Sequence, residues 1–239
     1  MFARILGKQL HYDVLGGGDP ILLVHGWGGS LESLRRLGNL LALTQRVILV
    51  DLPGFGSSEN PEPDWGVEEY TQVLCNLMDE LKIKRTSYFG HSFGGSLGMI
   101  LAIRRPKLIE HLFLCNSALK RPNKIVKIPL FLKGVLLRQK HLRIWLYRIF
   151  FPNSDIAKQP HLESNFKKIM QQDVSEYAPQ ISVSTHIIWG AGDTITPVDW
   201  AHELHQTIKK STLTIIPNAR HGLPLRDPES VVHEMQKYL

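Results

Sequence analysis

Three residues that could carry nucleophilic catalysis lie in separate glycine-containing segments of this chain. Ser92 lies within the letters GHSFGG, Asp193 within WGAGDTITP and His221 within PNARHG. A serine hydroxyl is a weak nucleophile until a base takes its proton, and the base needs an acid that fixes its tautomer. The three residues therefore predict a relay in which Ser92 is the nucleophile, His221 the general base and Asp193 the acid that orients the base.

The segment around Ser92 matches the G-x-S-x-G pattern of a serine on a sharp turn between a strand and a helix. Small residues at Gly90 and Gly94 leave room for a strained turn that exposes the serine Oγ. The motif alone has a second interpretation, in which the serine is an ordinary helix N-cap in a glycine-rich turn. The order Ser, Asp, His along the chain favours the catalytic interpretation.

A second glycine-rich segment, HGWGG at residues 25–29, directly follows an apolar run. Acyl transfer needs N–H donors aimed at the position where the oxyanion forms, and glycine-rich loops allow backbone N–H groups to approach that position. We expect the backbone N–H groups of Trp27 and Phe93 to form this oxyanion hole, and the same two residues to contact substrate. The imidazole of His25 is expected to pack inside for structural reasons.

The elements that must position these residues alternate along the chain. Apolar runs rich in β-branched residues predict strands at residues 21–24, 47–50, 86–89, 111–115, 185–189 and 212–216, after a hairpin over residues 3–15 that closes near Gly16, Gly17 and Gly18. Apolar residues at three- and four-residue spacing predict helices at residues 31–43, 67–81, 93–104, 197–208 and 228–238. The alternation predicts an α/β fold, a mostly parallel twisted sheet with helices on both faces. The three candidate residues then lie at the carboxyl ends of strands, where such sheets form their sites.

The alternation stops between residues 119 and 181, where the pattern is helical and no strand is expected. We therefore divide the chain into an α/β core, residues 1–118 and 182–239, and a helical insertion, residues 119–181. Between positions 119 and 150 the insertion has no acidic residue and nine basic ones: Lys120, Arg121, Lys124, Lys127, Lys133, Arg138, Lys140, Arg143 and Arg148.

Three interpretations of this basic segment stay open. It could be drawn to an anionic membrane surface, it could dock an acidic carrier protein or a phosphorylated substrate, or it could be a solvated helix face. No known nucleic-acid-binding motif accompanies the charge, so no nucleic-acid partner is expected.

Length and composition limit the class of protein. A chain of 239 residues with 43% hydrophobic content can bury a full core. The first twenty residues do not build the apolar run of a secretory signal, and no window reaches the roughly 18 apolar residues of a membrane span, so we expect a cytoplasmic protein. Cys75 and Cys115 lie in apolar segments and are expected to be buried, reduced thiols. His202 and His205 lie three residues apart without a visible third ligand, so no metal site is expected.

Over essentially its whole length the chain resembles the α/β-hydrolase superfamily. The resemblance rests on His-Gly-x-Gly at residues 25–28, DLPGFGSS at residues 51–58, the GHSFGG turn and the segments of the candidate acid and base. It implies that residues 119–181 form a cap over Ser92 that selects substrates, and that Asp51 shapes the wall of the site. Haloalkane dehalogenases and epoxide hydrolases of this fold carry an aspartate where this chain has Ser92. Residues 25–28 and 51–56 are similar to those of carboxylesterases that cleave pimeloyl-carrier-protein methyl ester.

These observations predict a serine hydrolase that cleaves carboxylic esters through an acyl-enzyme on Ser92, without a metal or other cofactor. A small-molecule ester or acyl compound is the expected substrate. Two alternatives stay open: hydrolysis of a carbon–carbon bond, which buried charges for a substrate carboxylate would favour, and a ligand receptor or scaffold with slow turnover. The sequence leaves open the natural substrate, its acyl length, the oligomeric state and the partner of the basic segment.

Overall fold

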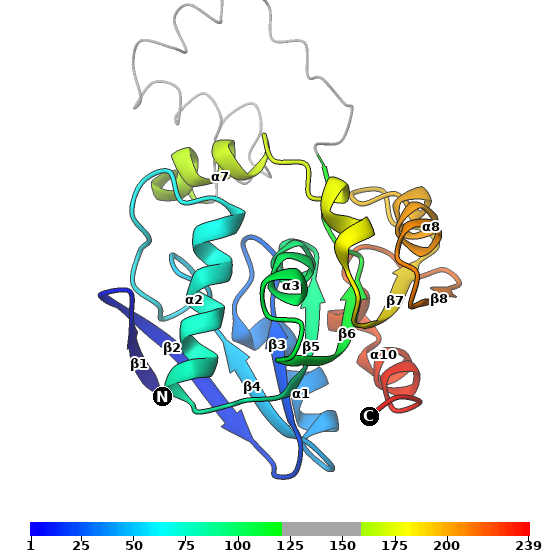
Figure 1. The fold of residues 1–239 in the computed structure, drawn as a ribbon, viewed down its shortest axis with the longest axis horizontal. Coiled ribbons are helices and arrows are strands. Elements are labelled where there is room, and N and C mark those ends of the chain that lie inside the picture. The colour runs from blue at the N-terminus through cyan, green and yellow to red at the C-terminus, as the bar shows by residue number, and fades with distance from the viewer. Residues whose placement is uncertain (121–158) are drawn as a thin grey trace, which may run out of the picture.

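An eight-stranded sheet with helices on both faces forms the body of the molecule (Figure 1). The computed structural model describes residues 1–120 and 159–239, and the structural statements below concern those residues. The strands are β1 (Phe2–Ile5), β2 (Lys8–Leu15), β3 (Pro20–Val24), β4 (Arg46–Val50), β5 (Thr86–His91), β6 (Ile109–Cys115), β7 (Ser184–Gly190) and β8 (Ser211–Ile216). Their order across the sheet is β1-β2-β4-β3-β5-β6-β7-β8.

The strands from β4 to β8 are parallel, and only β2 runs against its two neighbours. Val, Ile and Leu fill β3 and β4, and four of the five residues of each strand are buried, as a sheet covered on both faces requires. Each such side chain stabilises the fold by about 1.5–3 kcal/mol. The register between β5 and β6 shifts once, between Thr86 and Tyr88; beyond that point it pairs His91 with Cys115, and β7 pairs Trp189 with Ile215 of β8. The predicted α/β fold is therefore confirmed.

Two groups of helices cover the two faces of the sheet. One face packs against α2 (Val67–Glu80), α3 (Phe93–Arg104) and α8 (Val198–Thr207), and the opposite face against α1 (Arg35–Leu41), α9 (Leu223–Arg226) and α10 (Pro228–Met235). The 3₁₀ turn η1 (Leu31–Leu34) precedes α1, so the helix predicted at residues 31–43 begins as a tighter turn. Helix α3 has the bounds predicted from the sequence, and ten of its twelve residues are buried.

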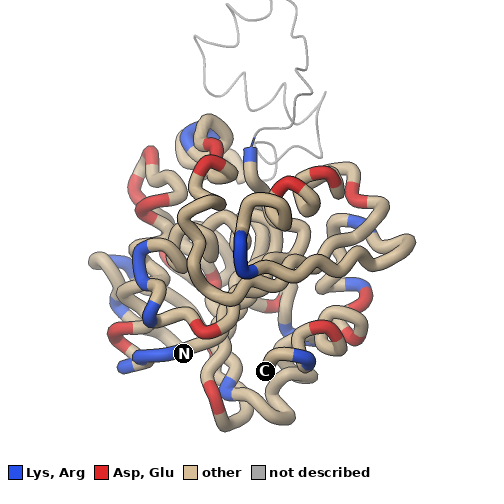
Figure 2. The backbone as a smooth tube through the Cα atoms, turned by 45° about the vertical axis from the view of Figure 1, so that its right-hand side comes forward, with Lys and Arg blue, Asp and Glu red and all other residues tan. Residues whose placement is uncertain are grey.

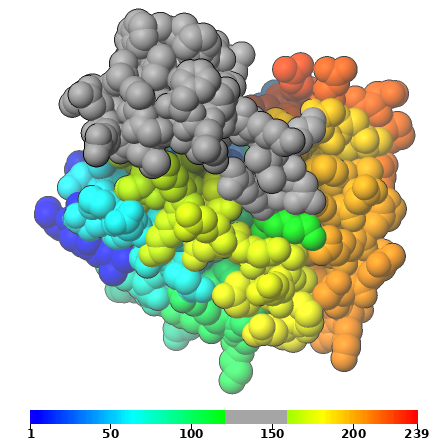
Figure 3. Space-filling model, turned by 90° about the horizontal axis from the view of Figure 1, so that it is seen from above, coloured from blue at the N-terminus to red at the C-terminus, as the bar shows by residue number. Residues whose placement is uncertain are grey.

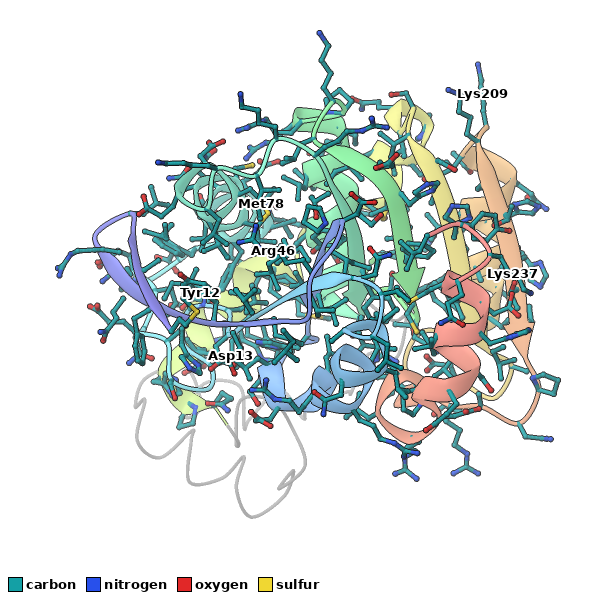
Figure 4. All side chains as sticks on the ribbon, turned by 90° about the horizontal axis from the view of Figure 1, so that it is seen from below. Tyr12, Asp13, Arg46, Met78, Lys209 and Lys237 are labelled. Atoms are coloured by element: carbon teal, nitrogen blue, oxygen red, sulfur yellow. The ribbon has the colours of Figure 1, made fainter. Side chains whose placement is uncertain are left out.

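The hairpin at the N-terminus turns at a different place from the predicted one. β1 and β2 pair around Leu6 and Gly7, which both have positive φ angles, and the three glycines at positions 16–18 instead link β2 to β3. A Cβ at Gly16 or Gly18 would overlap the backbone of residues 42–45, so these glycines permit close packing against the chain that leads into β4. Figure 4, seen from below, labels Arg46 at the start of β4 and, on the neighbouring β2, Tyr12 and Asp13, which pair with Val50 and Leu49 toward the other end of β4.

Residues 119–120 and 159–181 form the described part of the predicted insertion, and residues 121–158 lie outside the described residues. The segment of residues 159–181 contains η2 (Pro160–Leu162), α7 (Glu163–Ile169) and η3 (Ser175–Gln180). Seen from above, it lies between the region of α2 and the region of α8 (Figure 3). It therefore covers the end of the sheet to which the parallel strands point.

The cysteines lie as predicted, whereas most of the basic segment lies outside the described residues. Basic and acidic residues are mixed over the described part of the chain (Figure 2), whereas eight of the nine clustered basic residues lie outside it. Cys75 and Cys115 are free and buried, as predicted. No helix within residues 1–120 and 159–239 is long and apolar enough to cross a membrane.

Candidate active site

Ser92, His221 and Asp193 meet at the carboxyl end of the parallel sheet. Ser92 follows β5, Asp193 follows β7 and His221 follows β8. The His221 Nε2 lies 3.0 Å from the Ser92 Oγ, and the His221 Nδ1 lies 2.8 Å from the Asp193 Oδ2. With the proton on Nδ1, His221 donates to the carboxylate and its Nε2 accepts the serine O–H, which is the arrangement a general base needs.

A strained turn presents the Ser92 hydroxyl. Ser92 has φ 52° and ψ −115°, a left-handed conformation that is rare for a residue with a side chain. A Cβ at Gly90 would overlap the backbone of Gly94, and a Cβ at Gly94 would overlap the carbonyl of Val24. Glycine is therefore required at both positions for the turn to close, and α3 begins directly after the serine with its positive dipole end at the site.

Five donors surround the carboxylate of Asp193. Its Oδ1 accepts the N–H groups of Ile195 (2.8 Å) and Thr196 (2.9 Å). Its Oδ2 accepts the Thr196 hydroxyl (2.6 Å), the Asn116 side-chain amide and the His221 imidazole. Burial alone would raise the pKa of Asp193, but the hydrogen bonds from His221 and Thr196 outweigh it and lower the pKa to about 2. Asp193 is therefore an anion at neutral pH although it is 6% exposed.

Two backbone N–H groups beside the serine have no acceptor in the part of the chain that the structure describes. Phe93 is the first residue of α3, and the first N–H groups of a helix have no partner within it. Among the described residues the N–H of Trp27 likewise donates to no protein acceptor. A Cβ on Gly26 would lie 3.0 Å from the Ser92 Cβ, so the loop of Trp27 passes directly beside the serine. The two N–H groups predicted for the oxyanion hole thus flank the predicted nucleophile from two separate elements.

An apolar cavity of about 210 Å³ opens beside Ser92. Its described walls are mostly apolar and include Trp27, Val67, Phe93, Phe166, Ile169 and Met170. The ring of Trp27 lies 5.5 Å from that of Phe93 and 5.4 Å from that of Phe166 between centroids, which joins the core to α7. Lys120 is the one charged residue among the described lining residues, and it forms an ion pair of 2.9 Å with Glu203.

Polar contacts fix the α7 wall of the cavity to the start of α2. The Gln172 side chain accepts the N–H of Val67 at 2.9 Å, and Lys168 pairs with Glu69 at 3.1 Å. The Asn165 amide donates to the carbonyl of Glu62 at 2.9 Å. The segment that carries Phe166 and its apolar neighbours is therefore fixed to the α/β core by polar contacts.

The other residues singled out in the sequence lie outside this relay. His25 is fully buried, donates from Nδ1 to the Gly26 carbonyl at 2.7 Å and accepts the Leu52 N–H at 3.1 Å, and burial lowers its pKa. Asp51 accepts the N–H groups of Leu31 and Ser57 and so holds two loops together. His205 lies against Ser211, and no group of three metal-ligating side chains occurs in the described ranges.

Sequence reasoning did not identify three residues that support or line the site. Asn116 directly follows the strand β6, and this position at the carboxyl end of a parallel strand could have indicated that its side chain lies near the site. Thr196 lies three residues after Asp193, the spacing at which a side-chain carboxylate accepts from the following turn. Phe166 had no signal, because its place against Trp27 depends on how α7 packs.

Comparison with known proteins gives a consistent family assignment. The family model described as alpha/beta hydrolase fold matches residues 19–140. An uncharacterized protein of Mycobacterium tuberculosis is 24% identical over all of this chain and 80% of its own length. The 2-hydroxy-6-oxo-2,4-heptadienoate hydrolase of Pseudomonas putida is 22% identical over 98% of this chain and 93% of its own length. The crystal structure of the enol-lactonase from Burkholderia xenovorans is 26% identical, with a TM-score of 0.78 over 99% of this chain and 100% of that one.

Proposed function

Because the chain belongs to the alpha/beta hydrolase fold family, we propose that it is a hydrolase that cleaves carboxylic esters through an acyl-enzyme intermediate on Ser92. The observation that carries the proposal is the continuous relay of Ser92, His221 and Asp193, with contacts of 3.0 Å and 2.8 Å. The enol-lactonase relative supports it, because a lactone is a cyclic ester. The resemblance to pimeloyl-carrier-protein methyl ester carboxylesterases belongs to the same proposal.

In the first half of the proposed reaction, Ser92 Oγ attacks the ester carbonyl carbon while His221 Nε2 takes the hydroxyl proton. The carbonyl oxygen becomes an oxyanion that accepts the N–H groups of Trp27 and Phe93. When the tetrahedral intermediate collapses, the bond to the alcohol oxygen breaks and His221 returns the proton to the leaving alcohol. Asp193 keeps the imidazole in the required tautomer and stabilises the imidazolium that forms.

In the second half, water replaces the alcohol. His221 takes a proton from the water as the oxygen attacks the acyl carbon, and the same two N–H groups hold the second oxyanion. Collapse breaks the bond to Ser92 Oγ, which recovers the proton from His221. The products are the free acid and the regenerated serine, and no step requires an external oxidant or reductant.

The apolar cavity supports an acyl group of modest size as the part of the substrate next to Ser92. Its described walls carry aromatic and aliphatic side chains, and each methylene that they bury is worth about 0.8 kcal/mol, or roughly a fourfold gain in kcat/KM. Phe166 and Ile169 of α7 belong to these walls, which supports a substrate-selecting role for residues 119–181. Docking of a carrier protein or membrane at the basic segment stays a prediction, since residues 121–158 lie outside the described part of the chain.

Carbon–carbon bond hydrolysis is the second candidate, and the Pseudomonas putida relative favours it. The substrate named for that relative is an anion, so a site of this kind needs a cation for the carboxylate. Lys120 is the cationic residue of the described lining, and Glu203 already neutralises it. The described cavity therefore fits a neutral acyl group better than a dienoate.

Hydrolysis of a series of p-nitrophenyl esters, from acetyl to dodecanoyl, tests the proposal with wild type and Ser92→Ala side by side. The variant should lose at least about 10⁴-fold in kcat, and wild type should show an optimum at the acyl length that fills the cavity. Equal rates in the two proteins would remove Ser92 from the chemistry. Turnover of a 2-hydroxy-6-oxo-dienoate without ester turnover would favour the second candidate, and binding of either class without turnover would indicate a receptor or scaffold.

A further inference from the structure

The main chain of His221 has a single hydrogen-bond partner among the described residues. The His91 Nε2 lies 2.7 Å from the His221 carbonyl oxygen. Within residues 1–120 and 159–239, neither the N–H nor the carbonyl of His221 bonds to a backbone group. Among the described residues, the carbonyls of the flanking Arg220 and Gly222 accept N–H groups of α9, and only the His91 contact holds the main chain of His221 itself.

His91 is placed to give that contact a fixed geometry. It is the last residue of β5, 7% exposed, and it pairs in register with Cys115 of β6. The next residue, Ser92, donates its N–H to the Cys115 carbonyl at 3.1 Å. The serine that the base must reach and the side chain that holds the base are thus consecutive residues anchored to the same neighbouring strand.

The chemistry of the contact defines the protonation state of His91. A carbonyl oxygen only accepts, so the bonded Nε2 must carry a proton. Burial, and then the neighbouring His221, lower the pKa of His91 to about 3, so that the ring is neutral with its one proton on Nε2. The rings of His91 and His221 lie 5.0 Å apart between centroids, and a neutral His91 leaves His221 free to become an imidazolium without repulsion from a like charge.

From this geometry we propose that His91 is a positioning residue, which holds the main chain of His221 through its Nε2–H and so sets the distance between the general base and Ser92. The proposal rests on the proposed function, because it concerns the same relay. His91 touches no reacting atom and acts through His221 alone. Misplacement of a catalytic group by about 1 Å can cost about 100-fold in rate, so loss of the contact from His91 to the His221 carbonyl can lower kcat.

A matched pair of variants tests the tether. In His91→Gln the side-chain amide N–H reaches about as far as Nε2, whereas in His91→Asn the amide ends near the position of Nδ1 and falls short of the His221 carbonyl. We expect His91→Asn to lower kcat for a p-nitrophenyl ester about tenfold or more with KM within about twofold, and His91→Gln to recover the rate to within about threefold of wild type. Equal kcat values for the two variants, or a change in KM alone, would overturn the proposal.

Two further measurements separate this proposal from the proposed function. Labelling of Ser92 by a small fluorophosphonate, followed by intact mass, needs no natural substrate: absence of labelling in wild type contradicts the proposed function, whereas equal labelling rates for His91→Gln and His91→Asn contradict only the tether. The nitrogen NMR signals of the imidazoles in wild type then report His91 directly and do not depend on how the variants fold. We expect a neutral ring with the proton on Nε2 down to about pH 4, and a proton on Nδ1 would refute the tether whatever the activity.

Discussion

Replacement of Asp193 by asparagine changes one atom of the site and reverses a hydrogen bond. In the native protein both carboxylate oxygens face donors: two backbone N–H groups at Oδ1, and Thr196, Asn116 and His221 at Oδ2. An amide has one oxygen and one NH₂ group, so in either orientation its NH₂ meets donors. With the NH₂ toward His221, the imidazole must accept at Nδ1 and carry its proton on Nε2, where it can no longer accept the proton of Ser92.

The size of the effect follows from this reversal. Stabilising the wrong tautomer of a triad histidine costs about 10⁴-fold in kcat, which is about 5 kcal/mol of transition-state stabilisation. The fold should lose less, about 1–3 kcal/mol, because donors around a buried site lose a charged acceptor. We therefore expect Asp193→Asn to fold with a lowered melting temperature and to be almost inactive with KM little changed.

Kinetics with a p-nitrophenyl ester and thermal melting of the same preparation test this expectation. Asp19→Asn provides the matched control, because Asp19 is exposed in the turn before β3, away from the carboxyl ends of the strands. The control should keep wild-type kcat and melting temperature. If Asp193→Asn retained more than about a tenth of wild-type kcat while folded, then Asp193 would not orient the base and our assignment of the relay would be wrong.

Three further perturbations follow from the described structure. Burial lowers the pKa of His186 to about 4 from 6.5, so the unfolded chain takes up a proton first as pH falls, and stability is lost between about pH 6.5 and 4. Urea unfolding at pH 7 and pH 5 should therefore show that His186→Phe loses about 2 kcal/mol less unfolding free energy over this interval than wild type. Equal losses in the two proteins would contradict the reasoning. Gly94→Ala places a methyl group against the carbonyl of Val24, so the yield of folded, fluorophosphonate-reactive protein should fall sharply, and a fully active variant would show that the turn has room to spare. Phe166→Ala enlarges the cavity beside Trp27, so the ester series should show a longer optimal acyl chain with Ser92 reactivity unchanged, and an unchanged optimum would place the acyl group elsewhere.

The sequence predicted the features of this molecule that depend on local pattern. Six parallel strands lie within two residues of their predicted bounds at each end, because buried strands read as apolar runs between turns. The order of Ser92, Asp193 and His221, each in a loop after such a strand, was enough to predict that the sheet brings them together. The hairpin turn was predicted at the wrong glycines, because the glycine run at positions 16–18 is a stronger local turn signal than the pair Leu6-Gly7.

The missed features depend on contacts between segments distant in the sequence. The bond from His91 to the His221 carbonyl spans 130 residues, and the bond from Asn116 to Asp193 spans 77. A histidine before the serine of this turn, or an asparagine after a strand, has no local sequence pattern that specifies a partner so far along the chain. The same holds for Phe166, because its contact with Trp27 depends on the polar contacts that join the α7 segment to the start of α2.

The parallel pairing from β5 to β8 makes enzymatic activity a report on folding as well as on chemistry. Parallel strands close slowly, because long loops must be ordered before their contacts form. A slip of one residue in β8 would move its end by about 3.3 Å and reverse the direction of its side chains, which would carry His221 away from Ser92. During refolding, recovery of fluorophosphonate labelling should therefore lag behind recovery of the helical circular dichroism signal. The labelled fraction of a preparation then gives the fraction of molecules whose sheet has assembled in the native register.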